Sequence, residues 1–158
     1  MRRSSRIFCS SSRKGFDVPE VFHAERRVGF GEVDWARILY YPRYLHHCHL
    51  AFELFIEEAL DRSYSTFLED DDLGFPTVHL ETRYMRPIPY GCTLRMEVSV
   101  ARLGRSSMDV RYIGRIDEGE PAASALVTNV LVQMSSFASL PMPQWVREGL
   151  ERYLEMDG

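Results

Sequence analysis

The sequence lacks several features that would assign it to a class at once. It contains no run of about 18 apolar residues, the length that a membrane-spanning helix requires, so no membrane association is expected. Its three cysteines, Cys9, Cys48 and Cys92, include no CxxC pair and are odd in number. We therefore expect neither a thiolate zinc site nor a disulfide framework, and free thiols are typical of a reducing, cytoplasmic location.

An excess of basic residues is also missing. The chain has 19 lysines and arginines against 23 acidic residues, a formal net charge of -4. Little positive charge is left to neutralise a phosphate backbone, so nucleic acid is not an expected partner, although a local basic cluster could still bind a phosphorylated small molecule. The length of 158 residues, 45% of them hydrophobic, predicts one globular domain with its own core.

The beginning of the chain differs from the rest. Its first fourteen residues, MRRSSRIFCSSSRK, contain five basic residues and no acid. A transit peptide can have this composition, but the segment has no clear amphipathic face; a poorly ordered tail or an upstream start codon are the alternatives. We treat residues 1–20 as a basic, serine-rich extension and residues 21–158 as the folded domain.

One long helix is predicted from Pro42 to about Leu60. Proline is favoured at the first position of a helix, where its missing N–H has no intrahelical partner to lose. The apolar residues that follow recur every three or four positions and form one broad stripe: Tyr44, Leu45, Cys48, Ala51, Phe52, Phe55, Ile56 and Ala59.

Most of the remaining chain alternates as strands do. Apolar residues fall near every second position in Val21–Phe30, Thr77–Arg86, Thr93–Ala101 and Met108–Ile116, and Ala122–Met134 predicts one long apolar strand. Ser63–Pro76 predicts a loop with room for one helical turn, and Pro141–Leu154 a short amphipathic helix. We expect a single α+β domain in which an antiparallel sheet wraps around one long helix, leaving an open face or edge for dimerisation.

Several motifs resemble a known family. Residues Phe30–Phe55 contain the acidic pair of Glu32-Val33-Asp34, then Tyr41-Pro42 at the helix start and Tyr44-Leu45 inside the helix. This pattern resembles the signature of the 4-hydroxybenzoyl-CoA thioesterase family of the hotdog superfamily. ETRYMRPIPYGCTL resembles its second strand and glycine turn, and Leu103–Met108 its G-x-S-S turn, so the similarity runs from about His23 to Pro143.

The resemblance implies a single hotdog domain that hydrolyses acyl-CoA thioesters without a cofactor. In that family the acid that matches Asp34 attacks the thioester or activates water, and the backbone N–H at the position of Tyr41 polarises the carbonyl. The chemistry is reasonable, because a carboxylate can supply the attacking oxygen and a helix N-terminus has unpaired N–H groups with partial positive charge. Without the resemblance, Asp34 could equally be a turn or capping acid.

Other site residues are also suggested. Arg105, Ser106 and Ser107 match the family's nucleotide-side turn and could bind CoA phosphates, with an ordinary polar hairpin as the alternative. Arg37 replaces the usual glycine after the acid, which could alter the loop or add a cation near the thioester. His47 and His49 replace an aromatic residue and an acid; His47 or His49 could line the acyl pocket, with partly buried or dimer-facing histidines as the alternative. We expect Glu32 to be structural or to orient the loop.

Three functions stay open. The preferred one is hydrolysis of an acyl thioester, carried by CoA or by an acyl carrier protein, in a homodimer or homotetramer. The second is binding of the same acyl groups without cleavage, which Arg37 motivates. The third is a metal-dependent hydrolase, because His46, His49 and Glu53 share one helix face. A single helix rarely supplies a whole metal site, so we expect none.

Overall fold

The computed structural model describes residues 18–156, and the predictions for Cys9 and the first 17 residues lie outside this part of the chain. The helices are α1 (Tyr41–Leu60), α2 (Tyr64–Glu69) and α3 (Gln144–Glu151). The strands are β1 (Phe22–Arg27), β2 (Leu73–Gly74), β3 (Thr77–Tyr84), β4 (Thr93–Leu103), β5 (Ser107–Ile116), β6 (Pro121–Val130) and β7 (Val132–Gln133).

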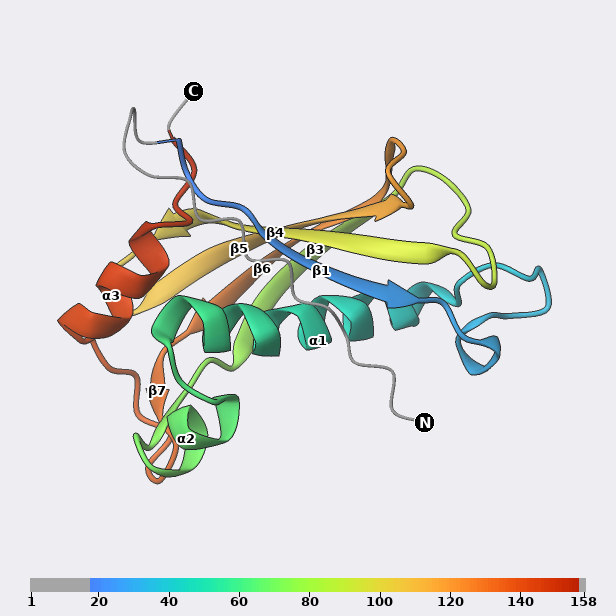
Figure 1. Cartoon of the computed structure of the whole chain (residues 1–158). Coiled ribbons are helices and arrows are strands. Elements are labelled where there is room, and N and C mark those ends of the chain that lie inside the picture. Colours follow the sequence, from blue (N-terminus) through green and yellow to red (C-terminus); the bar gives the residue numbers. More distant parts are fainter. Residues whose placement is uncertain (1–17, 157–158) are drawn as a thin grey trace, which may run out of the picture.

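Helix α1 lies across one face of an antiparallel sheet (Figure 1). The sheet has five strands in the order β1-β4-β5-β6-β3, so β1 and β3 are its edges. Alternate residues of the central strands point toward the helix and are buried, as are the stripe residues of α1, among them Leu94, Val98, Phe55 and Ile56. The predicted α+β domain, with a sheet wrapped around one long helix, is confirmed.

The start of α1 is held close to the sheet by one aromatic residue. Tyr44 is fully buried, and its hydroxyl donates a hydrogen bond to the carbonyl oxygen of Ala123 over 3.1 Å. Its ring lies over Gly114 in β5, where a Cβ atom would come within 2.8 Å of a ring carbon. The close approach therefore depends on glycine at position 114.

The prediction of one strand from Ala122 to Met134 is wrong. β6 ends at Val130, and β7 belongs to a separate two-stranded sheet with β2. The apolar pattern continues across the break, but the backbone of Leu131 leaves the ladder: its N–H donates to Ser106 and its carbonyl accepts from Leu140. Burial on both sides keeps the sequence apolar while the chain changes partners, so periodicity alone could not detect the break.

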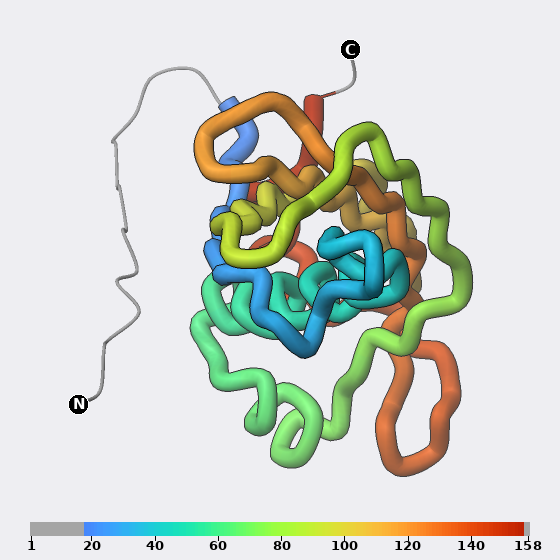
Figure 2. The backbone as a smooth tube through the Cα atoms, turned by 90° about the vertical axis from the view of Figure 1, so that its right-hand side faces the viewer, coloured from blue at the N-terminus to red at the C-terminus, as the bar shows by residue number. Residues whose placement is uncertain are grey.

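The two edge strands of the main sheet, β1 and β3, lie on opposite sides of the molecule (Figure 2), and their exposed side chains differ in character. β3 exposes large apolar side chains, including Val78, Leu80 and Tyr84, whereas β1 exposes charged residues such as Glu25 and Arg27. Charged side chains protect an edge from pairing with another chain, and β3 lacks this protection on its helix-facing side. No helix within residues 18–156 is long and apolar enough to cross a membrane.

We expect Gly114→Ala to destabilise the protein by about 1 to 3 kcal/mol, because the added methyl group overlaps the buried Tyr44 ring and overpacked cores cost energy of this order. Gly31→Ala is the matched control, since a Cβ there meets nothing within 4 Å and should change stability by less than about 0.5 kcal/mol. Urea unfolding of both variants measures the difference. Equal stability of the two variants would contradict the proposed close contact.

Candidate active site

Asp34 begins a tight loop between the short 3-10 turn at Phe30–Glu32 and α1. Its N–H donates to the carbonyl of Ile38 (3.0 Å), and its own carbonyl accepts from Arg37 N–H (2.9 Å). Its side-chain Oδ1 accepts from the N–H of Ala36 over 2.8 Å. The carboxylate is otherwise exposed, so one oxygen orders the loop and the other is free to meet a substrate or water.

Arg37 occupies the turn in the conformation that glycine would adopt. Its φ angle is 63°, in the left-handed region that is uncommon for residues with a side chain. This is a conformation that glycine adopts without steric cost. The cost is modest strain at Arg37, and the side chain itself is exposed.

The loop is fixed on two sides by main-chain contacts. Val33 and Leu39 form an antiparallel bridge, and Tyr40 N–H donates to the carbonyl of Glu32 over 2.9 Å. On the outer side, Leu39 N–H donates to Ile88 (2.7 Å) and Tyr90 N–H donates to Arg37 (3.2 Å). The segment between β3 and β4 thus supports the loop that carries Asp34.

Glu32 joins this loop to α1 from beneath. Its carboxylate accepts a hydrogen bond from Gly29 N–H over 2.7 Å and lies 3.1 Å from Nε2 of His47, with Arg26 3.5 Å away. The His47 contact is within ion-pair range, but its geometry falls short of a hydrogen bond. His47 is only 2% exposed. The expectation that Glu32 is a structural or orienting residue agrees with this placement.

Burial and charge act in opposite directions on these two residues. Desolvation is the main reason why the pKa of His47 lies below its usual value, and the nearby Glu32 carboxylate only partly offsets it. Desolvation would raise the pKa of Glu32, but the Gly29 hydrogen bond, His47 and Arg26 together outweigh it, and the pKa is lowered. At neutral pH the pair is therefore a carboxylate facing a neutral imidazole.

Tyr41 is the first residue of α1 and the second half of the candidate site. Its N–H has no hydrogen-bond partner within residues 18–156, Pro42 has no N–H, and the N–H of Arg43 donates back to Tyr40. The Tyr41 carbonyl is anchored by the hydroxyl of Tyr84 from β3 (2.5 Å). The only unpaired donor of these three positions is thus the Tyr41 N–H, at the positive end of a 20-residue helix.

His49 lies on α1 two turns after Tyr41 and lines a pocket of about 400 Å³ between α1 and β3. Its Nε2 is 2.9 Å from the Glu53 carboxylate. His46, the third member of the suggested metal set, does not join them, and residues 18–156 contain no group of three or more His, Cys, Asp or Glu side chains placed to hold a metal ion. The metal-dependent alternative gains no geometric support.

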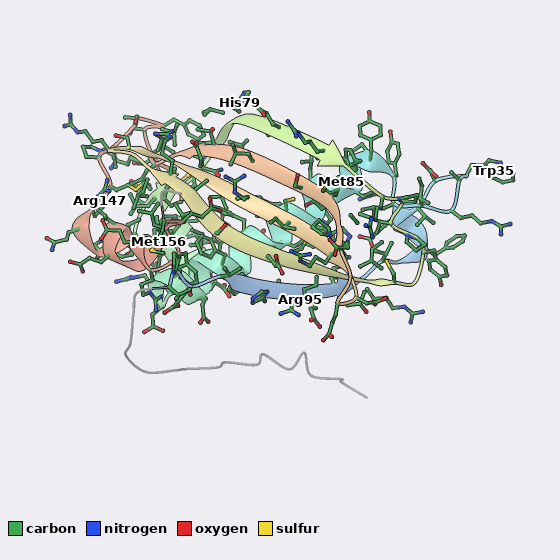
Figure 3. The ribbon with its side chains drawn as sticks, turned by 90° about the horizontal axis from the view of Figure 1, so that it is seen from above. Trp35, His79, Met85, Arg95, Arg147 and Met156 are labelled. Carbon is green, nitrogen blue, oxygen red and sulfur yellow. The ribbon has the colours of Figure 1, made fainter. Side chains whose placement is uncertain are left out.

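Arg105, Ser106 and Ser107 lie far from Asp34 within one protomer. They form the turn after β4, beside the start of α3, where Arg147 donates to the Gly104 carbonyl. Figure 3 shows Arg147 and Trp35, the neighbour of Asp34, at opposite ends of the molecule. The eleven residues of β4 between these ends span roughly 35 Å. One protomer does not bring this turn to the Asp34 loop.

Comparisons with known proteins identify a family to which this chain is similar. The family model described as "Thioesterase-like superfamily" matches residues 28–150. The 1,4-dihydroxy-2-naphthoyl-CoA hydrolase of Gloeothece citriformis is 30% identical over 129 residues, which cover 80% of this chain and 90% of that protein.

Solved structures agree with this result. A thioesterase superfamily protein from a Jannaschia species superposes with a TM-score of 0.81 at 25% identity, covering 86% of this chain and 94% of that one. A gentisyl-coenzyme A thioesterase superposes with a TM-score of 0.70 at 26% identity, covering 81% of this chain and 99% of that one.

The burial of His47 should make the protein sensitive to mild acid. Because the folded state lowers the pKa of His47, the unfolded chain binds a proton first as the pH falls below about 6.5, and the free energy of unfolding decreases. At pH 5.5 this loss is at most about 1.4 kcal/mol relative to neutral pH. His47→Gln should remove it, as measured by urea unfolding at both pH values.

His49→Gln is the matched control, because His49 lies on the same helix but is exposed. We expect this variant to keep the acid-dependent loss of the wild type. A loss that persists unchanged in His47→Gln would show that the acid sensitivity comes from other groups.

Proposed function

Since the chain belongs to the thioesterase-like superfamily, we propose that it hydrolyses an acyl-CoA thioester to a free acid and CoA, with Asp34 as the catalytic carboxylate. The observation that supports this most directly is the pairing of two groups on one short segment. An exposed carboxylate on a fixed loop and the unpaired N–H at the start of α1 lie seven residues apart in the chain, joined by a segment that the Val33–Leu39 bridge holds in place. These are the two functions that thioester hydrolysis requires.

The reaction follows from these two groups. The Tyr41 N–H donates to the thioester carbonyl oxygen and stabilises the negative charge that develops there. Asp34 either removes a proton from the attacking water or attacks the carbonyl carbon itself, forming a mixed anhydride that water then cleaves. In both cases the carbon–sulfur bond breaks, water supplies the new carboxyl oxygen, and the CoA sulfur leaves as a thiolate that takes up a proton.

The alternative, an acyl-CoA or acyl-carrier-protein binding protein without hydrolysis, rested on Arg37. The left-handed φ of Arg37 weakens that reason, because the turn keeps the backbone class that glycine would give. The acyl groups named for the two relatives are hydroxylated aromatic acids, 1,4-dihydroxy-2-naphthoyl and gentisyl. Aromatic acyl-CoAs, including 4-hydroxybenzoyl-CoA from the narrower family resemblance, are therefore the first substrates to test.

Assembly forms the second part of the proposal. We propose a homodimer, or a tetramer built from it, that covers the edge strand β3, where Val78 is 61% exposed. Two copies meeting there would bury apolar surface that a lone protomer leaves in water. Arg105, Ser106 and Ser107 keep a role in CoA binding only if a neighbouring subunit presents them.

We expect Asp34→Asn to lower turnover by at least about 100-fold, the usual contribution of a positioned acid–base or nucleophilic carboxylate. The asparagine oxygen can still accept from Ala36 N–H, so the loop should survive while the negative charge is lost. Thiol release from a panel of aromatic and fatty acyl-CoAs measures the effect. Asp70→Asn, the same change at an exposed acid outside the site, should retain wild-type turnover.

The panel also separates the two functions. Full turnover by Asp34→Asn would eliminate Asp34 as the catalytic group. Saturable binding of acyl-CoA by the wild type with no thiol release across the whole panel would favour the non-hydrolytic alternative.

The assembly proposal predicts a mass of at least two chains in sedimentation or light scattering. Val78→Arg should shift the protein toward a monomer, since it places a charge on the exposed apolar side of β3. His23→Arg adds the same residue at an exposed position of the opposite edge strand and should leave the mass unchanged. A wild-type protein that is monomeric at micromolar concentration contradicts the proposed assembly.

A further inference from the structure

Helix α1 begins without a side-chain cap. Within the described residues, 18–156, Tyr40 at the N-cap makes no side-chain hydrogen bond to the first turn, and the second helical residue is Pro42. The first N–H groups of a helix have no partners inside the helix, and helix ends fray where nothing else holds them. The Tyr41 N–H therefore needs a restraint from outside the helix if it is to keep one direction.

A residue of the sheet supplies such a restraint. Tyr84 is the last residue of β3 and lies 43 positions after Tyr41 in the chain. Its hydroxyl donates a hydrogen bond to the carbonyl oxygen of Tyr41 over 2.5 Å, at the short end of the range for O–H···O bonds. Desolvation by burial raises the pKa of Tyr84 above its usual value, so the hydroxyl stays protonated and remains a donor at neutral pH.

The ring of Tyr84 is itself held in place. It packs edge-on against the ring of Tyr44, with 5.9 Å between the ring centroids. Tyr44 is buried and bonded to the carbonyl oxygen of Ala123, and Tyr84 faces that same residue across the β3–β6 ladder. Two tyrosines thus connect the start of α1 to one point of the sheet, one from the helix and one from the strand.

The residue that Tyr84 holds lies close to a pocket that can take an acyl group. Leu45, one helical turn after Tyr41, lines the pocket of about 400 Å³ between α1 and β3, which we call the α1–β3 pocket. Leu80 lines it as well and shares one face of β3 with Tyr84. A thioester whose acyl group occupies this pocket can therefore reach Tyr41 with its carbonyl oxygen.

The hydrogen bond from Tyr84 also limits the direction of the Tyr41 N–H. The N–H and the carbonyl of one residue are linked through only two soft backbone torsions, so fixing the carbonyl restricts how far the N–H can turn. An oxyanion donor is effective when it already points at the place where negative charge develops. A displacement of about 1 Å at such a site can cost about 100-fold in rate.

We propose that Tyr84 is a positioning residue for thioester hydrolysis: its hydroxyl holds the Tyr41 carbonyl and thereby keeps the Tyr41 N–H directed at the thioester oxygen. This inference rests on the proposed function, since it takes the Tyr41 N–H as the oxyanion donor. Tyr84 acts through Tyr41 and not on the substrate. It adds to the site a strand residue that is remote in sequence from the segment that carries Asp34.

Tyr84→Phe is the direct test, because it removes the hydroxyl and keeps the ring that packs against Tyr44. We expect kcat for aromatic acyl-CoAs to fall by about tenfold while KM changes by less than about twofold, since the lost restraint acts mainly in the transition state. Thiol release measures both constants. An unchanged kcat, or a rise in KM alone, overturns the proposal.

Tyr153→Phe is the matched control. It removes the hydroxyl of another tyrosine that packs edge-on against an aromatic ring, that of Phe55. Tyr153 directly follows α3, which lies beside the C-terminal end of α1, whereas Tyr41 is at the N-terminal end (Figure 1). Both kcat and KM should stay at the wild-type values, and a tenfold loss of kcat here as well would show that the effect is not specific to Tyr84.

Two non-hydrolysable analogues of one acyl-CoA separate positioning from a general loss of structure. In the ketone analogue a methylene group replaces the thioester sulfur, and in the thioether analogue a methylene group replaces the carbonyl, so only the ketone presents an oxygen to the Tyr41 N–H. Calorimetry gives their dissociation constants independently of the fraction of folded protein. We expect Tyr84→Phe to weaken binding of the ketone by at least about threefold and to leave binding of the thioether unchanged.

Failure of the proposed hydrolysis gives a different result from failure of this inference. If the wild-type protein cleaves no acyl-CoA, hydrolysis is wrong, but a selective loss of ketone binding in Tyr84→Phe still supports the role of Tyr84 in directing the Tyr41 N–H. Equal changes for the ketone and the thioether reject that role whether or not hydrolysis occurs.

Discussion

The close packing of the first turns of α1 against the sheet is the constraint on which the candidate site depends. Tyr44 is buried over Gly114 and hydrogen-bonded to Ala123, so the helix cannot shift along or away from the sheet without losing both contacts. The Tyr41 N–H lies one turn earlier and inherits this rigidity. Preorganisation matters for such a donor, because an oxyanion site that must reorganise during the reaction gives up much of its stabilisation.

The Asp34 loop needs a separate restraint, and Glu32 provides it. The residue contacts the loop through its carbonyl, the preceding turn through Gly29 and the helix through His47. The His47 imidazole is neutral at neutral pH, so its contact with the Glu32 carboxylate adds little net stability, but replacing His47 would remove a polar neighbour of a buried carboxylate. Such a contact fixes relative position more than it stabilises the fold. It therefore suits a loop whose carboxylate must stay aligned with the start of a helix.

Much of the fold could be predicted from the sequence, because apolar periodicity reports burial on one face. The strand prediction from apolar periodicity failed at Leu131, where the chain changes strand partners inside a continuously apolar run. Asp34, Arg37 and Tyr41 could be proposed from the sequence because they are near neighbours in the chain and belong to one motif. His47 gave a weak signal: it is polar at a position where relatives of the resembled family have an aromatic residue.

Substrate choice and assembly are coupled in this arrangement. Leu80 is both a wall of the α1–β3 pocket and part of the exposed side of β3. A partner that covers β3 would press against one wall of the pocket, so the shape available to the acyl group would depend on both subunits. The Tyr41 N–H at the start of α1, by contrast, belongs to one protomer. The position of the oxyanion donor would then be a property of the single chain, while the width of the pocket would be a property of the assembly.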